Sequence, residues 1–169
     1  MFKPDQLMEK AQHSKFELWK LNKAINFMIP FNRPHGFKIL EITKTHVTTL
    51  IPYKKKNFNH IRGLHATALA TLSEFTTGLL LLNILGIENY RLILQRLDIE
   101  YHYQGKMSAT AHFKVDDQWL QQHVYTPLKQ QDSVVVPCPI DIHDKQGNKL
   151  TSATIYWQLK TWDKVKTKV

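Results

Sequence analysis

The feature that most constrains the fold is a continuous apolar segment spanning residues 66–85. Strands in globular proteins rarely exceed about ten residues, so a run of this length predicts a helix, and Gly86 stands where helices commonly end. A helix with almost no polar face must be surrounded by protein. We therefore expect the rest of the chain to cover this helix on all sides.

The remaining chain predicts strands. Apolar and polar residues alternate with a period of two in 97–103, 107–113, 134–142 and 151–159, while 37–44 and 47–53 are rich in β-branched and aromatic residues. A period of two is typical of antiparallel strands with one solvated face. About five or six strands, mostly in consecutive order, can bury the helix only by curling around it. The pattern predicts an α+β fold with a long central helix.

Residues 1–30 have apolar side chains at three-, four- and seven-residue intervals, which predicts an extra N-terminal amphipathic helix ending at Pro30. Such a helix can lie on a membrane surface or pack on its own domain, and the width of its apolar face favours packing. Further along, Asp116 or Asp117 predicts the cap of a short helix that runs through Val124 and ends near Pro127.

Composition limits the class of protein. With 169 residues, of which 43% are hydrophobic, the chain fits one domain over 1–169, with a frayed tail over 163–169. The single cysteine, Cys138, rules out an internal disulfide and favours a cytoplasmic location. No membrane span is expected, because the apolar segment contains Glu74 and other polar residues. The net charge of +9 attracts anions of any kind, and nothing beyond that charge predicts nucleic-acid binding.

Glu74 is unexpected inside an apolar helix. An ionised carboxylate there costs several kilocalories per mole unless it is paired, hydrogen-bonded or protonated. Two interpretations are open. The acid is catalytic, with a pKa raised by burial, or it is structural, bonded to backbone or basic groups or reaching solvent at an interface.

Polar residues precede the helix at Asn59, His60, Gly63 and His65. The first N–H groups of a helix have no intrahelical partners and can receive a developing oxyanion. Together these groups supply an oxyanion site, an orienting amide and a general base, a set that suits acyl transfer to water. No third metal ligand stands at a familiar spacing, so neither a metal nor a cofactor is expected.

The segment is similar to the pattern N-x-x-G-x-x-H-G-G-x-x-x-x-L-x-D of hotdog-fold thioesterases, the group that contains the phenylacetate-pathway and 4-hydroxybenzoyl-CoA thioesterases. Asn59, His65, Leu72 and Glu74 fall on its asparagine, histidine, leucine and acid. The wider layout, over about residues 34–162, resembles a hotdog branch described only as a domain of unknown function. That layout includes the Asp-x-x-Gly turn at residues 144–147.

The resemblance implies a homodimer or a dimer of dimers, formed by sheets pairing edge to edge, with acyl-CoA sites at the subunit interface. It places the thioester carbonyl at the helix N-terminus, near His65, Ala66 and Thr67. It implies that Glu74 of the partner subunit acts as general base or nucleophile. Asn59 would position the carbonyl or the water.

Two departures from the pattern matter. Arg62 occupies the glycine position after Asn59, although Gly63 could supply the turn by a one-residue shift, and Ala66-Thr67 replaces the paired glycines that let a thioester approach the backbone. Either the pocket is reshaped for another substrate, or the protein is a non-catalytic hotdog module that binds an acyl group or a protein partner. Arg62 and the lysines at 54–56 would suit the phosphates of coenzyme A, although a solvated surface explains the lysines equally well.

Overall fold

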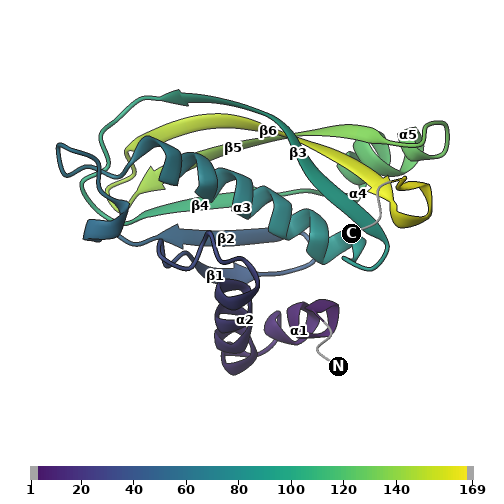
Figure 1. Ribbon diagram of the computed structural model, residues 1–169, viewed down its shortest axis with the longest axis horizontal. Helices are drawn as coiled ribbons and strands as arrows, with labels where there is room; N and C mark the ends of the chain where they lie inside the picture. The colour runs from purple at the N-terminus through teal and green to yellow at the C-terminus, as the bar shows by residue number, and fades with distance from the viewer. Residues whose placement is uncertain (1–3, 167–169) are drawn as a thin grey trace.

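The computed structural model describes residues 4–166 and contains six strands and one long helix (Figure 1). The helices are α1 Pro4–Ala11, α2 Lys15–Met28, α3 Ala66–Leu85, α4 Asp117–Leu120 and α5 Thr126–Leu128, with a π-helical turn at Gln121–Tyr125 and 3₁₀ turns at Lys55–Asn57 and Trp162–Lys164. The strands are β1 Lys38–Ile42, β2 His46–Ile51, β3 Tyr90–Tyr101, β4 Ala109–Lys114, β5 Val134–Asp144 and β6 Lys149–Thr161.

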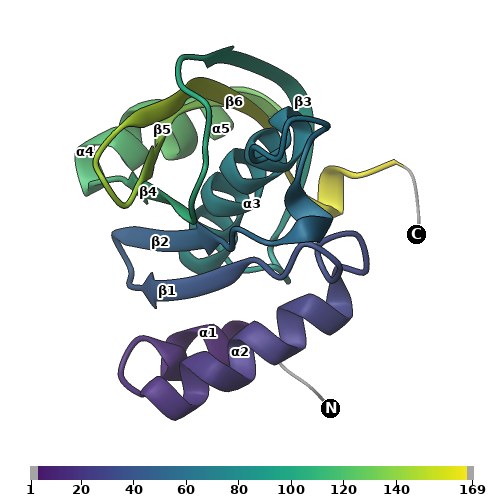
Figure 2. The same cartoon turned by 90° about the vertical axis from the view of Figure 1, so that its left-hand side faces the viewer.

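The strands form one antiparallel sheet in the order β1-β2-β4-β5-β6-β3, and this sheet curls around α3 (Figure 2). The helix packs on β2, β3, β4, β5 and β6. Its side chains at Leu72, Leu80 and Leu81 are fully buried, which accounts for the apolar run in the sequence. The predicted α+β fold, a central helix wrapped by an antiparallel sheet, is confirmed.

The strands are mostly in consecutive order, as predicted, with one exception. β1 pairs with β2, and β4, β5 and β6 follow one another, while β3 crosses to the far edge and pairs with β6 from Tyr90↔Thr161 to Tyr101↔Thr151. Length explains the choice of partner. β3 has 12 residues and β6 has 13, whereas β4 has only 6 and would leave half of the β3 backbone unpaired.

The N-terminal region is two helices rather than one. The chain turns between α1 and α2, where Ser14 caps α2 by accepting a hydrogen bond from the N–H of Glu17 at 3.4 Å. One face of α2 packs on the domain through the buried Leu21, as the width of the apolar face predicted. The Asn22 amide also binds both backbone groups of Ile39 in β1, at 2.7 and 2.9 Å. That contact covers part of the outer edge of the sheet.

The short helix predicted after Asp116 is present and ends near Pro127, as expected. Asp116 is the cap, accepting from the N–H of Trp119 at 2.7 Å, and helical backbone runs through Pro127 to Leu128. Pro127 is tolerated because it falls in the first positions of α5, where a backbone N–H is not needed. At the other end, the 3₁₀ turn Trp162–Lys164 overlaps the start of the predicted frayed tail, 163–169, of which residues 167–169 lie outside the described residues.

Among residues 4–166, α3 is the one helix long and apolar enough to cross a membrane. In its most apolar window, 61% of the residues are buried inside the domain. Its composition therefore matches its place as the core helix.

Candidate active site at the start of the central helix

A tight turn at residues 59–63 precedes α3. The side-chain oxygen of Asn59 accepts hydrogen bonds from the N–H groups of Ile61 and Gly63, at 3.1 and 2.8 Å, and the Asn59 N–H binds the Gly63 carbonyl. Asparagine is suited to such turns because its side chain reaches its own backbone a few residues on. The oxygen of Asn59 is thus occupied, and its NH₂ group is the part left to meet a ligand.

Arg62 adopts the left-handed backbone conformation, with φ 58°, that the family pattern assigns to glycine. The interpretation in which Gly63 takes over this role by a one-residue shift is wrong, because the positive φ falls on Arg62. Gly63 packs closely against the Gln104 side chain instead. A Cβ atom there would lie 2.9 Å from Nε2 of Gln104.

His65 caps α3. Its Nδ1 accepts from the N–H of Thr67 at 3.2 Å and lies 2.8 Å from the Thr67 hydroxyl, so these two predicted site residues satisfy each other. The N–H groups of Ala68 and Leu69 bind the His65 carbonyl. Within the described part of the chain, the N–H of Ala66 has no partner. The helix therefore offers one free backbone donor to an oxyanion, at Ala66.

An open hollow of about 320 Å³ lies beside this donor. Its walls come from the turn, the start of α3 and the segment that leaves β3: Asn59, Leu64, Ala66, Leu69, Tyr101, His102, Tyr103, Gln104 and Gly105. The Tyr101 hydroxyl donates to the Ala66 carbonyl at 2.9 Å and fixes this first residue of the helix. The structure thus brings Asn59 and Ala66 together at one cavity.

The residues from 101 to 105 were missed as site residues by the sequence reasoning, which assigned Tyr101 and Tyr103 to an alternating strand. Their only sequence signal was the cluster of polar and aromatic side chains that ends in Gly105. Which end of α3 they meet depends on the pairing of β3 with β6. Neighbouring residues alone do not predict that pairing.

Glu74 lies two helical turns further along α3 and is half-buried. Desolvation by burial raises the pKa of its carboxyl above the ordinary value. No hydrogen bond or ion pair holds this carboxylate among the residues the structure describes, so the interpretation of an acid bonded to backbone or basic groups loses its support. Glu74 does not line the hollow of its own chain, since a helix rises about 1.5 Å per residue and Ala66 is about 12 Å away.

The predicted basic residues lie around the turn. His60 and Arg62 are exposed and do not line the hollow. Lys106 donates to the Ile61 carbonyl at 2.8 Å. Partial burial and the neighbouring Lys56 and Lys38 lower the pKa of Lys54. Lys54 thus clusters with Lys56 and Lys38 in the segments before the turn, while Arg62 lies in the turn and Lys106 contacts it.

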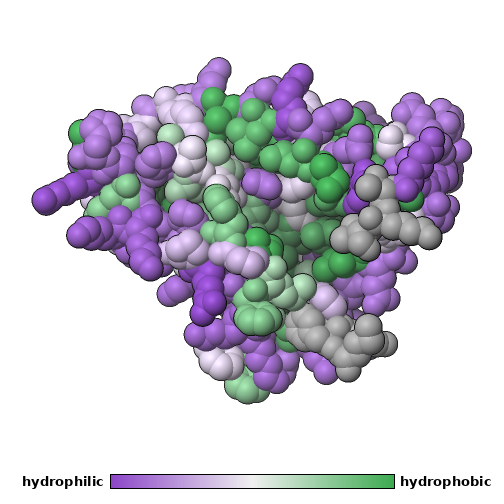
Figure 3. Space-filling model, in the orientation of Figure 1, coloured by the Kyte–Doolittle hydropathy of each residue, from purple (hydrophilic) through white to green (hydrophobic). Residues whose placement is uncertain are grey.

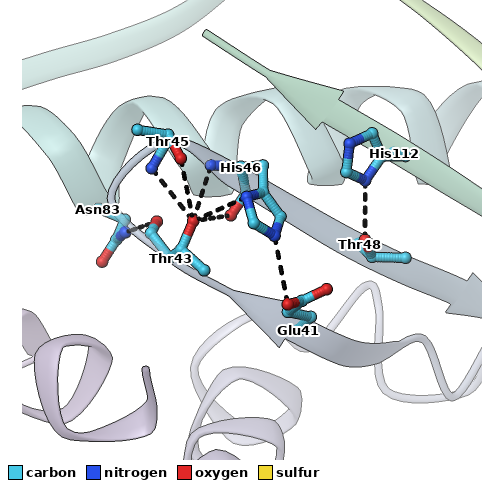
Figure 4. A network of polar contacts seen from close by, with 7 residues as sticks. All are labelled: Glu41, Thr43, Thr45, His46, Thr48, Asn83 and His112. Carbon is cyan, nitrogen blue, oxygen red and sulfur yellow. Dashed lines mark hydrogen bonds and ion pairs between the residues drawn. The ribbon is translucent and has the colours of Figure 1, made fainter. Parts of the chain in front are cut away.

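A second polar cluster lies on the face of the sheet opposite α3 (Figure 4). His46 contacts Glu41 at 3.3 Å, and its ring lies 5.4 Å from the ring of His112, which binds Thr48 at 2.9 Å. Burial, His46 and Lys114 lower the pKa of His112. Over residues 4–166, no group of three or more His, Cys, Asp or Glu side chains is arranged to hold a metal ion. The cluster ties β1, β2 and β4 together.

Comparisons with known proteins place this geometry in a family. A model of a domain of unknown function, DUF4442, matches residues 18–159. A comparison with curated proteins finds no match.

Among solved structures, a probable thioesterase from Pseudomonas aeruginosa is similar at 20% identity with a TM-score of 0.76, covering 85% of this chain and 95% of that one. A thioesterase from Haemophilus influenzae has 12% identity and a TM-score of 0.66, with 85% and 90% covered. A thioesterase from Staphylococcus aureus has 15% identity and a TM-score of 0.64, with 78% and 98% covered. At these identities the likeness shows the hotdog fold and not the activity. The chain belongs to the DUF4442 family and has the hotdog fold of these thioesterases.

Proposed function

We propose that the protein hydrolyses a thioester, an acyl-CoA or a compound like it, with water activated at Glu74. The observation that carries the proposal is the half-buried carboxylate of Glu74, which has a raised pKa and no partner within the described chain. A partly buried carboxylate without a hydrogen-bond or ion-pair partner adds nothing to the stability of the fold. A base with a pKa closer to neutrality is, however, what proton abstraction from water requires.

In this proposal the thioester carbonyl lies in the hollow and its oxygen accepts from the N–H of Ala66. Water attacks the carbonyl carbon while the Glu74 carboxylate takes its proton, and negative charge develops on the carbonyl oxygen at the helix N-terminus. The carbon–sulfur bond then breaks, and the proton passes to the leaving thiolate. The products are a carboxylic acid and a free thiol. The Asn59 NH₂ group orients the substrate carbonyl or the water.

The proposed site needs two subunits. Glu74 and Ala66 of one chain are about 12 Å apart, whereas a general base acts within about 3 Å of its proton. The acid of the partner would complete the site in a homodimer. The strand β3 supports this arrangement, because it is a 12-residue edge strand that leaves Ile93 47% exposed, whereas the opposite edge strand β1 has 5 residues and is bound by Asn22.

The positive charge beside the hollow suits the phosphates of coenzyme A. Arg62 and Lys56 are exposed, and Lys54 is held near them by the 3₁₀ turn. An anionic group bound there would place the attached thioester toward the hollow. It would also offset the burial and the repulsion from Lys56 and Lys38 that lower the pKa of Lys54.

A second candidate is a non-catalytic hotdog module that binds an acyl group or a protein partner. The observation that favours it is the pair formed by His65 and Thr67, which occupies the N–H of Thr67 and leaves one backbone donor for an oxyanion instead of two. Ala66 and Thr67 also bring side chains to a place where relatives in the family pattern have glycine.

The test measures free thiol released from acyl-CoA esters of several chain lengths by the wild-type protein and by Glu74→Gln. Loss of a general base lowers kcat by at least about 100-fold. Glu88→Gln is the matched control, because Glu88 is an exposed acid in the loop after α3. Equal turnover by Glu74→Gln would exclude Glu74 as the base. Acyl-CoA binding by a wild-type protein without turnover on any chain length would favour the binding module.

A further inference from the structure

The helix α2 has a second apolar face, turned away from the domain. Its inner face consists of Leu18, Leu21 and Ile25, which join the core. Phe16, Trp19 and Phe27 are separated by three or eight positions and lie on the opposite side of the helix. They are 62%, 56% and 80% exposed. An amphipathic helix that only packs on its own domain would have polar residues at these positions.

The chain after α2 extends this face. Met28, Ile29 and Phe31 are also exposed, so six of the thirteen exposed large apolar residues found in the described chain fall between residues 16 and 31. In Figure 3, pale and green residues lie among purple ones on the lower part of the surface, where Figure 1 places α2. Figure 2 shows α1 and α2 as a layer outside β1. We call the exposed residues 16, 19, 27, 28, 29 and 31 the outer aromatic face.

Lysines share this face. Lys20 and Lys23 follow Phe16 by four and seven residues, so their side chains emerge between the aromatic rings. The Lys20 ammonium lies 4.4 Å from the Phe16 ring centre, and the Lys23 ammonium lies 5.7 Å from the Trp19 ring centre. Between residues 10 and 38 there are six basic residues and one acid, Glu17, which pairs with Lys20 at 2.9 Å. The face is therefore apolar with two lysine ammonium groups among its rings, and the segment around it, residues 10–38, carries a net positive charge.

Aromatic rings together with lysines favour a membrane surface over a protein as the partner of this face. The cores of protein–protein interfaces are depleted of lysine, because an ammonium group is costly to desolvate. At a membrane surface, aromatic rings enter the boundary between headgroups and acyl chains while lysine ammonium groups stay at the level of the lipid phosphates. We propose that the outer aromatic face docks the protein on an anionic membrane surface, with α2 lying in the plane of the interface.

The test is flotation with lipid vesicles, using vesicles of phosphatidylcholine alone and vesicles of phosphatidylcholine and phosphatidylglycerol in equal parts. The wild-type protein should float with the anionic vesicles, bind the neutral ones at least about tenfold more weakly, and be released by high salt. Absence of binding to the anionic vesicles would overturn the proposal.

Two double variants separate the apolar and electrostatic contributions. Trp19→Ser/Phe27→Ser and Lys20→Glu/Lys23→Glu should each weaken binding to anionic vesicles at least about tenfold. Val135→Ser, an exposed apolar residue on β5, and Lys129→Glu/Lys145→Glu, which changes the net charge equally, are the matched controls and should bind as the wild type does. Equal losses in variants and controls would contradict a specific face.

Sedimentation of the same proteins without lipid tests whether a second copy of the chain, instead of a membrane, covers the outer aromatic face. If Trp19→Ser/Phe27→Ser dissociates an oligomer that the wild type forms, and vesicles bind neither protein, the face is covered by a second copy of the chain and the membrane proposal is wrong. Thiol release is measured in parallel on soluble substrates. The membrane variants should retain it, so the outcomes of the two proposals are independent.

Discussion

At the scale of single residues, Glu74 differs from every other carboxylate in the chain. The other thirteen acids are either exposed or held by a hydrogen bond or ion pair, as Asp144 is by the N–H groups of Gln146 and Asn148. Glu74 is half-buried, and its carboxylate has no such partner among the described residues. This uncompensated burial lowers stability, and it is the reason to assign the residue a chemical role.

The raised pKa of Glu74 makes a prediction about stability and pH. Because folding favours the protonated form, the contribution of Glu74 is most favourable below its unfolded pKa, near about 4.3, and is lost as the pH rises through the higher folded pKa. Glu74→Gln should therefore be more stable than the wild type at pH 7, and the difference should vanish toward pH 4. Urea unfolding at both pH values measures this.

Glu88→Gln is again the control, and it should show no such difference because Glu88 is exposed. A Glu74→Gln variant less stable than the wild type at pH 7 would mean that the carboxylate has a stabilising partner, contrary to the structure.

At the scale of elements, the sequence predicted α3 and the strands from their periodicity, because burial on one or both faces imposes that periodicity directly. The break at Ser14 was missed, since apolar residues continue at helical spacing on both sides of it. The place of β3 was missed because it depends on matching lengths between strands that are distant in sequence. For the candidate site, the residues before and within the apolar helix led to the prediction of Asn59, His65 and Glu74, of which Asn59 lines the hollow. Tyr101 and Gln104 reach the hollow only through the pairing of β3.

A glycine in the middle of α3 also had no explanation in the sequence. A Cβ atom at Gly78 would lie 2.7 Å from the ring of Trp157, which is held by a hydrogen bond of 2.9 Å to Thr77. Gly78→Ala gains about 1 kcal/mol in helix propensity but overpacks a fixed ring, so a net loss of about 1–2 kcal/mol in unfolding free energy is expected. Denaturant unfolding measures the loss.

Thr71→Ala serves as the control in the same helix. Thr71 is half-buried and its hydroxyl bonds within α3, so the change should stay within about 0.5 kcal/mol. If Gly78→Ala were as stable as the wild type, α3 would not pack on β6 as closely as the structure has it.

At the scale of the whole molecule, the two proposed surfaces do not compete. A dimer through β3 would use one edge of the sheet, while the outer aromatic face lies beside β1 at the opposite edge. Two subunits paired through β3 would therefore each keep an outer aromatic face available.

The two-subunit site makes a prediction that no single variant can test. Ala66→Pro removes the free N–H at the first position of α3, where proline is tolerated, and the extended backbone of His65, with φ −67° and ψ 137°, suits a residue before proline. Ala66→Pro and Glu74→Gln should each be inactive as homodimers. A mixed dimer has one site with both groups intact, the N–H of the Glu74→Gln chain and the acid of the Ala66→Pro chain.

With random pairing, half of the dimers in an equal mixture are mixed and each has one working site of two, so thiol release should recover to about one quarter of the wild-type value. Subunits are exchanged by unfolding and refolding the two variants together. Mixing them without exchange is the control and should recover nothing. If the refolded mixture stays inactive although mass spectrometry shows mixed dimers, then Ala66 and Glu74 do not act on one substrate from two subunits.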